Sequence, residues 1–251
     1  MSRADEPLVQ RTRRFSQYTS TSFLSETREE QVAIREARHH VRHTFARFLP
    51  HDKSAPILDV GCGYGRYVKA LQELGYGGVR GIELSQDQVR RAIEHLGLRG
   101  VEQADALHWL ADKHEAFECI LVFDVLEHLS EDDLRDLIRM MGDALRRGGT
   151  LIVQVPNGLS PMNPDIYGDI THVRAFTTKS IRQLFRLAGL EPLAYFEGLG
   201  PVTTFAGALR RILWAGVVRP MVDVTVRVIH GNIPDRLYSA NFIAVAGRPR
   251  A

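Results

Sequence analysis

The first candidate for chemistry is a glycine-rich stretch that follows a short apolar run. Residues 59–65 read Asp-Val-Gly-Cys-Gly-Tyr-Gly, and the run Ile57–Val60 has the length of a buried strand. Glycines let the backbone turn tightly and approach a ligand closely, and a following helix N-terminus offers free N–H groups. A dinucleotide-binding loop needs a third glycine or alanine where this sequence has Arg66, so a dehydrogenase is disfavoured. Asp59 would repel a phosphate and attract a cationic ligand.

Two further acids follow at the ends of the next expected strands. Glu83 closes the run Val79–Glu83, and its ionised carboxylate, which only accepts hydrogen bonds, can hold both hydroxyls of a ribose. Asp105, followed by Ala106, closes the third strand position and can accept a hydrogen bond from an adenine amino group. The plainer interpretations are a helix N-terminal charge for Glu83 and a solvated turn residue for Asp105. The acids together favour S-adenosylmethionine, a nucleoside that carries an ammonium and a sulfonium group.

His172 is the candidate general base. It stands in the run Gly168–Thr177, after a long loop rich in proline, asparagine and glycine, where the chain is expected to return over the cofactor. Methyl transfer from a sulfonium is an in-line displacement, so a hydroxyl acceptor needs alignment, exclusion of water and a group that takes its proton. The alternative is that His172 caps or hydrogen-bonds the loop.

A second polar group, Asp124, Glu127 and His128, follows the expected fourth strand. Residues three and four apart on a helical turn share a face, and this spacing can hold a hard cation. We expect Asp124 and His128 to shape the catalytic site.

Short apolar runs alternate with helical periodicity along the chain. Expected strands are Ile57–Val60, Val79–Glu83, Cys119–Phe123, Thr150–Val155, Leu190–Glu197 and Asn241–Ala246, and expected helices are Glu26–Leu49, Arg66–Gly75, Gln86–Gly97, Glu131–Leu145 and Thr178–Ala188. Gly148 and Gly149 are expected to stop the helix before them. This alternation predicts an α/β fold with a doubly wound, parallel sheet. The last two strands need no crossover helix if they pair as an antiparallel edge.

Two segments lie outside that core. Residues 1–50 are expected to form an N-terminal arm and helix that act as a lid, and residues 51–251 form one domain with an insertion at about 199–236. The insertion combines apolar residues such as Phe205 and Trp214 with arginines such as Arg210 and Arg211. It predicts a cap over the acceptor pocket or a homodimer contact, and the alternative is peripheral contact with an anionic membrane through residues 203–229.

From about Ile57 to Ala246, these features resemble the class I S-adenosylmethionine-dependent methyltransferases. The resemblance implies a Rossmann-like, seven-stranded, mostly parallel sheet with an antiparallel last hairpin and a helical insertion between the last two strands. It implies S-adenosylmethionine as the methyl donor and S-adenosylhomocysteine as the product. By position it implies cofactor contacts at Asp59, Gly61, Gly63, Gly65, Glu83, Leu84, Asp105, Ala106 and Phe123.

Further resemblances suggest acceptors. The segment around His172 is similar to a subgroup of small-molecule and glycan methyltransferases from polysaccharide and lipid-linked sugar pathways, which implies O-methylation of a hydroxyl on a sugar or lipid-linked glycan intermediate. The acidic and histidine group resembles that of quinone O-methyltransferases, which implies, as the alternative, a quinone or aromatic acceptor with a divalent metal. We favour a site without metal, because the Glu-His pair is also common in methyltransferases that use none. A third alternative is a catalytically silent module that binds the cofactor for assembly.

Composition excludes several other classes. The chain is 44% hydrophobic and 25% charged, as soluble globular proteins are. Cys62 and Cys119 are the only cysteines and indicate a reducing compartment. We expect a cytoplasmic protein, peripheral at most at the inner face of the membrane, because no signal-like run opens the chain and charges interrupt Ile212–Ile229. Nucleic acid is not an expected partner, since the basic residues form no aromatic-studded face and no Asn/Asp-Pro-Pro-Tyr motif follows the fourth strand.

Overall fold

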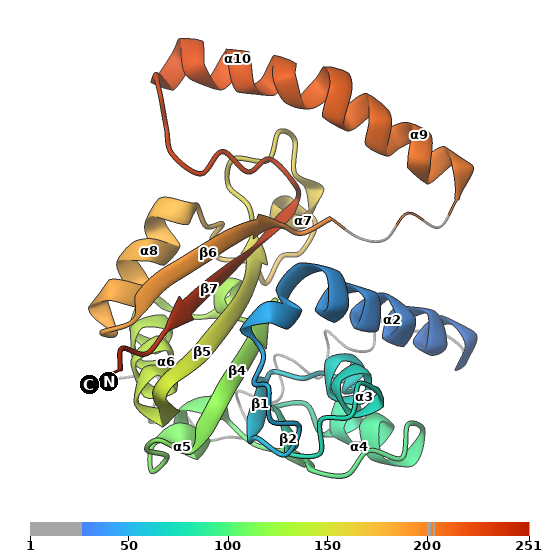
Figure 1. The fold of residues 1–251 in the computed structure, drawn as a ribbon, viewed down its shortest axis with the longest axis vertical. Helices are drawn as coiled ribbons and strands as arrows, with labels where there is room; N and C mark the ends of the chain where they lie inside the picture. The colour runs from blue at the N-terminus through green and yellow to red at the C-terminus, as the bar shows by residue number, and fades with distance from the viewer. Residues whose placement is uncertain (1–26, 200–201, 203, 251) are drawn as a thin grey trace.

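The computed structural model describes residues 27–199, 202 and 204–250, and its centre is one mixed sheet (Figure 1). The strands are β1 (Ile57–Val60), β2 (Val79–Glu83), β3 (Val101–Gln103), β4 (Phe117–Phe123), β5 (Leu145–Pro156), β6 (Glu191–Glu197) and β7 (Asn241–Gly247). Their order in the seven-stranded sheet is β3-β2-β1-β4-β5-β7-β6. β1 to β5 pair in parallel, whereas β7 runs antiparallel to both β5 and β6. The predicted doubly wound sheet with an antiparallel last hairpin is confirmed.

Helices cover both faces of the sheet, which explains why β1 is buried along its whole length. One face carries α2 (Thr27–His40), α3 (Arg66–Glu73) and α4 (Gln86–Glu94), and the other carries α5 (Ala106–Leu110), α6 (Glu131–Ala144) and α8 (Thr178–Leu187) (Figure 1). Each face buries its own apolar cluster against these helices. The apolar runs of the central strands therefore point into two cores, and the strand ends stay accessible at the edge where the loops lie.

Helix starts are fixed by side-chain caps. Ser85 and Ser130 accept hydrogen bonds from the first turns of α4 and α6, and Thr177 forms a capping box with Ser180 at the start of α8. The N-terminal helix continues past α2 as a π-helical turn η2 (Val41–Phe45) and a 3-10 turn η3 (Ala46–Phe48). Within the described residues, the expected N-terminal helix is thus present from Thr27 to Phe48, and it ends in a π-helical turn and a 3-10 turn. Residues 1–26 of the predicted lid lie outside the described residues.

The prediction that Gly148 and Gly149 stop a helix is wrong. α6 already ends at Ala144, because Leu145 is extended and pairs with Phe117 as the start of β5. The two glycines lie inside β5, next to an irregularity in its pairing with β4. The third strand also ends earlier than expected, so that Asp105 follows it and caps a helix instead of closing the strand.

The insertion between β6 and β7 is helical, as expected, and projects from the body. It forms α9 (Phe205–Leu213), η5 (Trp214–Val218) and α10 (Arg219–His230), which run as one long segment across the top of Figure 1. None of the residues of these three elements is buried. Over the described parts of the chain, we find no helix with the length and apolar character needed to cross a membrane.

Candidate active site

The glycine loop after β1 is built for close approach. Gly61 has φ +70°, and a Cβ there would lie 2.4 Å from Val125 Cγ2. Gly65, the residue before α3, has φ +85°, and its Cβ would lie 2.3 Å from Leu98 Cδ1. Both positions therefore require glycine for conformation and for space. The loop borders a cavity of about 360 Å³ at the carboxyl ends of β1, β2 and β4.

The predicted cofactor residues gather around this cavity. Its lining includes every one of them except Gly65, together with Asp124 and His128 of the predicted catalytic group. Gly65 lies outside the lining, at the N-cap position of α3. The topology thus brings together residues that are up to 64 positions apart in the sequence, since residues 59 to 123 supply the strand ends.

Glu83 ties the loop to β2. Its Oε2 accepts a hydrogen bond from Gly63 N at 2.9 Å and its Oε1 accepts one from Ser85 N at 2.8 Å. Burial raises the pKa of this carboxyl, although the backbone hydrogen bonds oppose that effect. Each carboxylate oxygen has more than one acceptor direction, so Glu83 can still accept from a ribose. Ser85 caps α4, and Glu83, considered above as a charge at that helix N-terminus, lies two residues before the cap.

Asp59 is the most deeply placed acid of the cavity. Only 2% of the residue is exposed, and its Oδ2 is buried without a hydrogen-bond partner among the described residues. Burial raises its pKa to about 7, a rise that Arg66 opposes and Glu83 reinforces. A buried, unpaired carboxylate oxygen is costly on its own and favours a bound cation. This arrangement fits the ammonium end of the expected cofactor.

Asp105 has a structural task beside its predicted one. Its Oδ1 accepts hydrogen bonds from Leu107 N at 3.0 Å and His108 N at 3.3 Å, which caps α5. Leu84 and Ala106 line the cavity next to it, as expected for residues beside an adenine ring. An adenine contact from Asp105 stays a prediction.

Asp124 does not share a helical face with Glu127 and His128, so that part of the prediction is wrong. It lies at the end of β4 with φ +56°, before the 3-10 turn η4 (Leu126–His128) begins. Its carboxylate accepts hydrogen bonds from Gln154 Nε2 at 3.0 and 3.1 Å and lies 3.5 Å from Arg66. Asp124 and His128 both line the cavity, whereas Glu127 does not.

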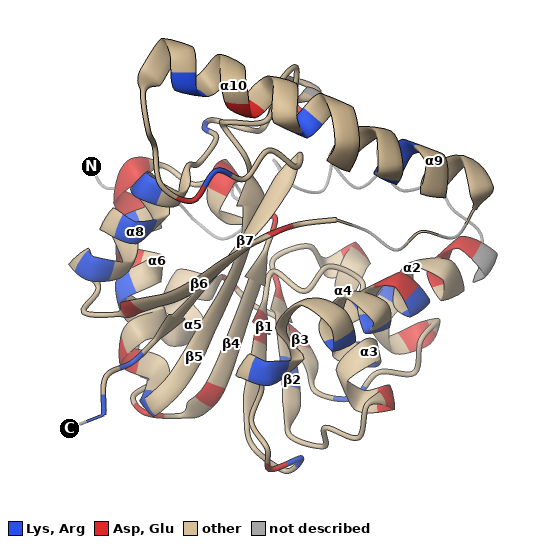
Figure 2. Cartoon of the chain, turned by 45° about the horizontal axis from the view of Figure 1, so that its top comes forward, with Lys and Arg blue, Asp and Glu red and all other residues tan. Residues whose placement is uncertain are grey.

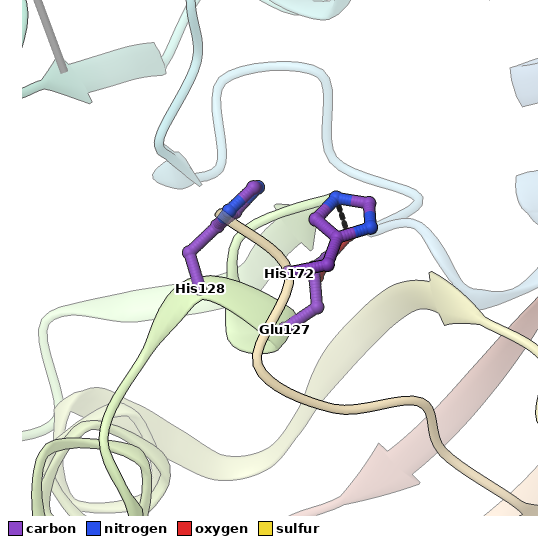
Figure 3. A group of neighbouring side chains, drawn as sticks. All are labelled: Glu127, His128 and His172. Atoms are coloured by element: carbon purple, nitrogen blue, oxygen red, sulfur yellow. Dashed lines mark ion pairs between the residues drawn. The ribbon is translucent and has the colours of Figure 1, made fainter. Parts of the chain in front are cut away.

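His172 takes the place expected of Asp124 (Figure 3). Its ring centroid lies 4.7 Å from that of His128, and its Nε2 lies 4.0 Å from both Glu127 Oε1 and Asp169 Oδ2. Thr171 Oγ1 lies 2.9 Å from His128 Nδ1 and donates to Asp169 Oδ1 at 2.6 Å. The loop after β5 therefore returns over the cavity and places two imidazoles side by side. His172 does not line the cavity itself and adjoins it through His128.

Burial controls protonation in this group. It raises the pKa of Glu127 to about 8, with the charge of Asp124 adding to the effect. Burial also lowers the pKa of His128, and the neighbouring His172 lowers it further. Near neutral pH, Glu127 is therefore largely protonated and His128 is neutral. Glu127 Oε2 and His172 Nδ1 are both buried without a hydrogen-bond partner among the described residues.

Sequence reasoning missed a histidine and tyrosine pair on the α2 side of the site. His40 Nδ1 lies 2.8 Å from the hydroxyl of Tyr67, which lines the cavity, and Phe123 packs edge-on against that ring at 4.6 Å. Burial lowers the pKa of His40 to about 4, so the imidazole is neutral. The signal was weak, because His40 reads as one of several polar residues at the end of a surface helix.

Comparisons with known proteins agree with this geometry. Residues 33–195 match the family described as "Methyltransferase domain". Trans-aconitate 2-methyltransferase of Sinorhizobium fredii is 31% identical over 158 residues, 61% of this chain and 59% of that protein. Ubiquinone biosynthesis O-methyltransferase of a Chelativorans species is 34% identical over 104 residues, 40% of each chain. These matches thus span about three fifths or less of the relatives' own lengths.

Solved structures share the fold. A SAM-dependent methyltransferase from Archaeoglobus fulgidus superposes with a TM-score of 0.61 at 17% identity, over 85% of this chain and 94% of that one. A Thermotoga maritima protein described as a possible histamine N-methyltransferase gives a TM-score of 0.58 at 17% identity, over 86% and 92%. At such identities the likeness concerns the fold alone.

Proposed function

Because this chain belongs to the class I S-adenosylmethionine-dependent methyltransferases, we propose that it methylates a hydroxyl of a sugar or lipid-linked glycan intermediate. The observation that carries the proposal is the group of His172, His128, Glu127 and Asp169, which the loop after β5 places beside the cofactor cavity. A hydroxyl acceptor needs a proton acceptor, and this group supplies one.

The cofactor cavity accounts for the methyl donor. The glycine loop allows close approach, Glu83 lines the cavity and would accept hydrogen bonds from the ribose, and the unpaired oxygen of Asp59 favours the positive ammonium group. Bound S-adenosylmethionine supplies an activated methyl group on a sulfonium. The chain's own residues then hold the acceptor in line with it and exclude water.

His172 is the residue that we assign as general base. Its Nε2 lies 4.0 Å from the carboxyl groups of both Glu127 and Asp169. Because Glu127 is largely protonated near neutral pH, the carboxylate of Asp169 stabilises the positive charge that the imidazole gains when it takes the hydroxyl proton. His128, held by Thr171, stays neutral and orients the acceptor at the cavity wall.

The test is His172→Gln, with His114→Gln at an exposed position as the matched control. We expect His172→Gln to lower kcat by about 100-fold or more, which is typical for loss of a general base. Its affinity for S-adenosylhomocysteine should stay that of the unmodified protein. Methyl transfer from labelled S-adenosylmethionine to sugar and polyprenyl-linked sugar acceptors measures kcat. Calorimetry measures the affinity for S-adenosylhomocysteine. An unchanged kcat removes His172 as the base.

The helical insertion supports a lipid-linked acceptor, and we propose that its outer face rests on an anionic membrane. Phe205, Ile212, Met221 and Val228 are each between 66% and 87% exposed, a pattern that a free surface helix avoids. Arg210 and Arg227 of the same segment, which do not line the cavity beneath it, suit anionic headgroups. Sedimentation with phosphatidylglycerol vesicles should carry the protein down, and Ile212→Asp with Val228→Asp should release it. A dimer in gel filtration that these same substitutions dissociate would favour the homodimer contact instead.

A second candidate function, methylation of a quinone or aromatic hydroxyl with a divalent metal, is favoured by one observation. Glu127, His128 and His172 each offer a ligand atom, and these atoms lie within 4.8 Å of one another. The unpartnered Glu127 Oε2 and His172 Nδ1 fit such an ion, and two imidazoles with one carboxylate suit a first-row metal such as Zn²⁺. Those three residues would hold the metal, which would lower the pKa of a bound acceptor hydroxyl. Loss of activity after dialysis against a chelator, restored by Zn²⁺, would support this candidate over the glycan one.

A further inference from the structure

A second, larger cavity lies outside the cofactor site. It has a volume of about 770 Å³ and lies between the end of the N-terminal helix, the end of β6 and the long helical insertion. Its basic lining residues are His39, Arg42, His43, Arg47, Arg211 and Arg219. Figure 2 shows basic segments along both α2 and the α9–α10 insertion. Two elements far apart in the sequence thus turn positive side chains toward one space.

The acidic lining does not balance these charges. Glu197 is the acid among the lining residues, and its Oε1 lies 3.5 Å from the Arg219 guanidinium. Arg42 and Arg47 have no ion-pair partner within the described ranges. Like charges that face one cavity repel each other, and that repulsion is relieved when an anion enters.

Arg47 is held in place for such a role. Its guanidinium carbon lies 4.9 Å from the Phe48 ring centroid and 5.0 Å from that of Phe196. Stacking on aromatic rings fixes the plane of a guanidinium and leaves its N–H edges free to bind a carboxylate or phosphate in a two-pronged manner. The cavity therefore offers oriented donors as well as positive charge.

The cavity adjoins the reaction site through α2. His39 lines it, and the next residue, His40, contacts Tyr67 of the cofactor cavity. A ligand anchored among the arginines would thus be held on the far side of α2 from the cofactor. This relation suits an acceptor that is fixed by one charged end while another part reaches the methyl group.

We propose that this arginine-lined cavity binds a polyanionic part of the acceptor, either a phosphate or diphosphate or a polycarboxylate. The proposal rests on the proposed methyltransferase function and names the chemical class of its acceptor. A lipid-linked sugar carries phosphate, and trans-aconitate, named for one relative, is a tricarboxylate. Both present several negative oxygens, which arginines recognise by the same hydrogen bonds.

The experiment is titration calorimetry with inorganic pyrophosphate and with citrate, at low salt and with S-adenosylhomocysteine bound. It compares the unmodified protein with Arg42→Gln/Arg211→Gln and with a control, Arg80→Gln/Arg186→Gln, whose residues are exposed and distant from the cavity. We expect at least one anion to bind, the cavity variant to bind it about tenfold or more weakly, and the control to stay within twofold. Preference for pyrophosphate indicates a phosphate acceptor, and preference for citrate indicates a polycarboxylate.

Vesicles separate a lipid headgroup from a free anion. If pyrophosphate competes with phosphatidylglycerol vesicles for the unmodified protein and not for the cavity variant, the phosphate comes from lipid. Failure of both anions to bind the unmodified protein, or equal binding by the cavity variant, overturns the proposal. Calorimetry also measures the S-adenosylhomocysteine affinity of every sample. Failure of the proposed function would appear separately, as the absence of that affinity in the unmodified protein.

Discussion

Asp59→Asn should stabilise the ligand-free protein at alkaline pH while it weakens cofactor binding. The carboxyl is 2% exposed with one oxygen unpartnered, and its pKa rises from 3.8 to about 7 on folding. A rise of about three pKa units corresponds to about 4 kcal/mol, the penalty for keeping the ionised form buried above pH 7. Asparagine has the same shape and carries no charge.

The sign of the pH dependence follows from proton binding. Between pH 3.8 and 7 the folded state holds a proton on Asp59 that the unfolded state has lost. The free energy of unfolding contributed by this group therefore falls as pH rises through that window and is flat above it. Asp59→Asn removes the fall, so its advantage grows from near zero at pH 4 to about 4 kcal/mol at pH 8.

Denaturant unfolding at pH 4 to 8, with and without S-adenosylmethionine, measures both effects. With saturating cofactor the advantage should shrink, because the ligand binds the variant about tenfold more weakly when the opposite charge is lost. Asp136→Asn, on the exposed face of α6, is the control and should change the free energy of unfolding only slightly. If the unfolding free energies of Asp59→Asn and the unmodified protein differ by the same amount at every pH, the reasoning is refuted. If the variant misfolds, the slope of unfolding free energy against pH in the unmodified protein still tests it.

Two further substitutions test the framework of the site. Gly61→Ala should cost about 1–3 kcal/mol of unfolding free energy and reduce cofactor affinity, because its Cβ would lie 2.4 Å from Val125 Cγ2 at a positive φ. Thermal melts measure the loss of stability. The control Gly216→Ala, with open space around it, should be neutral or stabilising in these melts. The buried amide of Asn157 donates to the carbonyls of Leu237 at 2.8 Å and Ser239 at 2.9 Å, and these hydrogen bonds anchor the loop that carries His172. Asn157→Ala should therefore cost about 3 kcal/mol of unfolding free energy and lower kcat more than it lowers cofactor affinity. A kcat that stays unchanged in a folded Asn157→Ala protein would show that this anchor does not position the base.

The sheet was predictable because its signals are local. Short apolar runs, the glycines after Val60 and the acids near strand ends are readable within a few residues of one another, and parallel pairing then brings the strand ends to one edge. Errors arose where pairing overrode local preference. Gly148 and Gly149 look like a helix stop, yet Leu145 already pairs with Phe117, so the strand absorbs both glycines.

The acceptor side was less predictable because it depends on contacts distant in sequence. Asp124 has the spacing to join Glu127 and His128, but a left-handed residue at the end of β4 and hydrogen bonds from Gln154 hold it apart. His172 joins them only because the loop after β5 folds back. The sequence predicted that this loop returns over the cofactor, but the periodicity of one segment carries no information about which side chains the return brings together.

The charges of the two cavities favour different ligands, the methyl donor in one and the acceptor in the other. Asp59 and Glu83 line the cofactor cavity, Asp59 buried and Glu83 half-buried, and Glu127, largely protonated near neutral pH, lies beside it. On the other side of α2, arginines from residues 42–47 and from the insertion face one space. A cationic sulfonium compound is thus favoured in one cavity and disfavoured in the other, and a polyanion the reverse. Charge would therefore direct each substrate to its own cavity before any specific contact forms. Because buried acids are screened less than the more open arginines, raising the salt concentration should weaken acceptor binding more than cofactor binding.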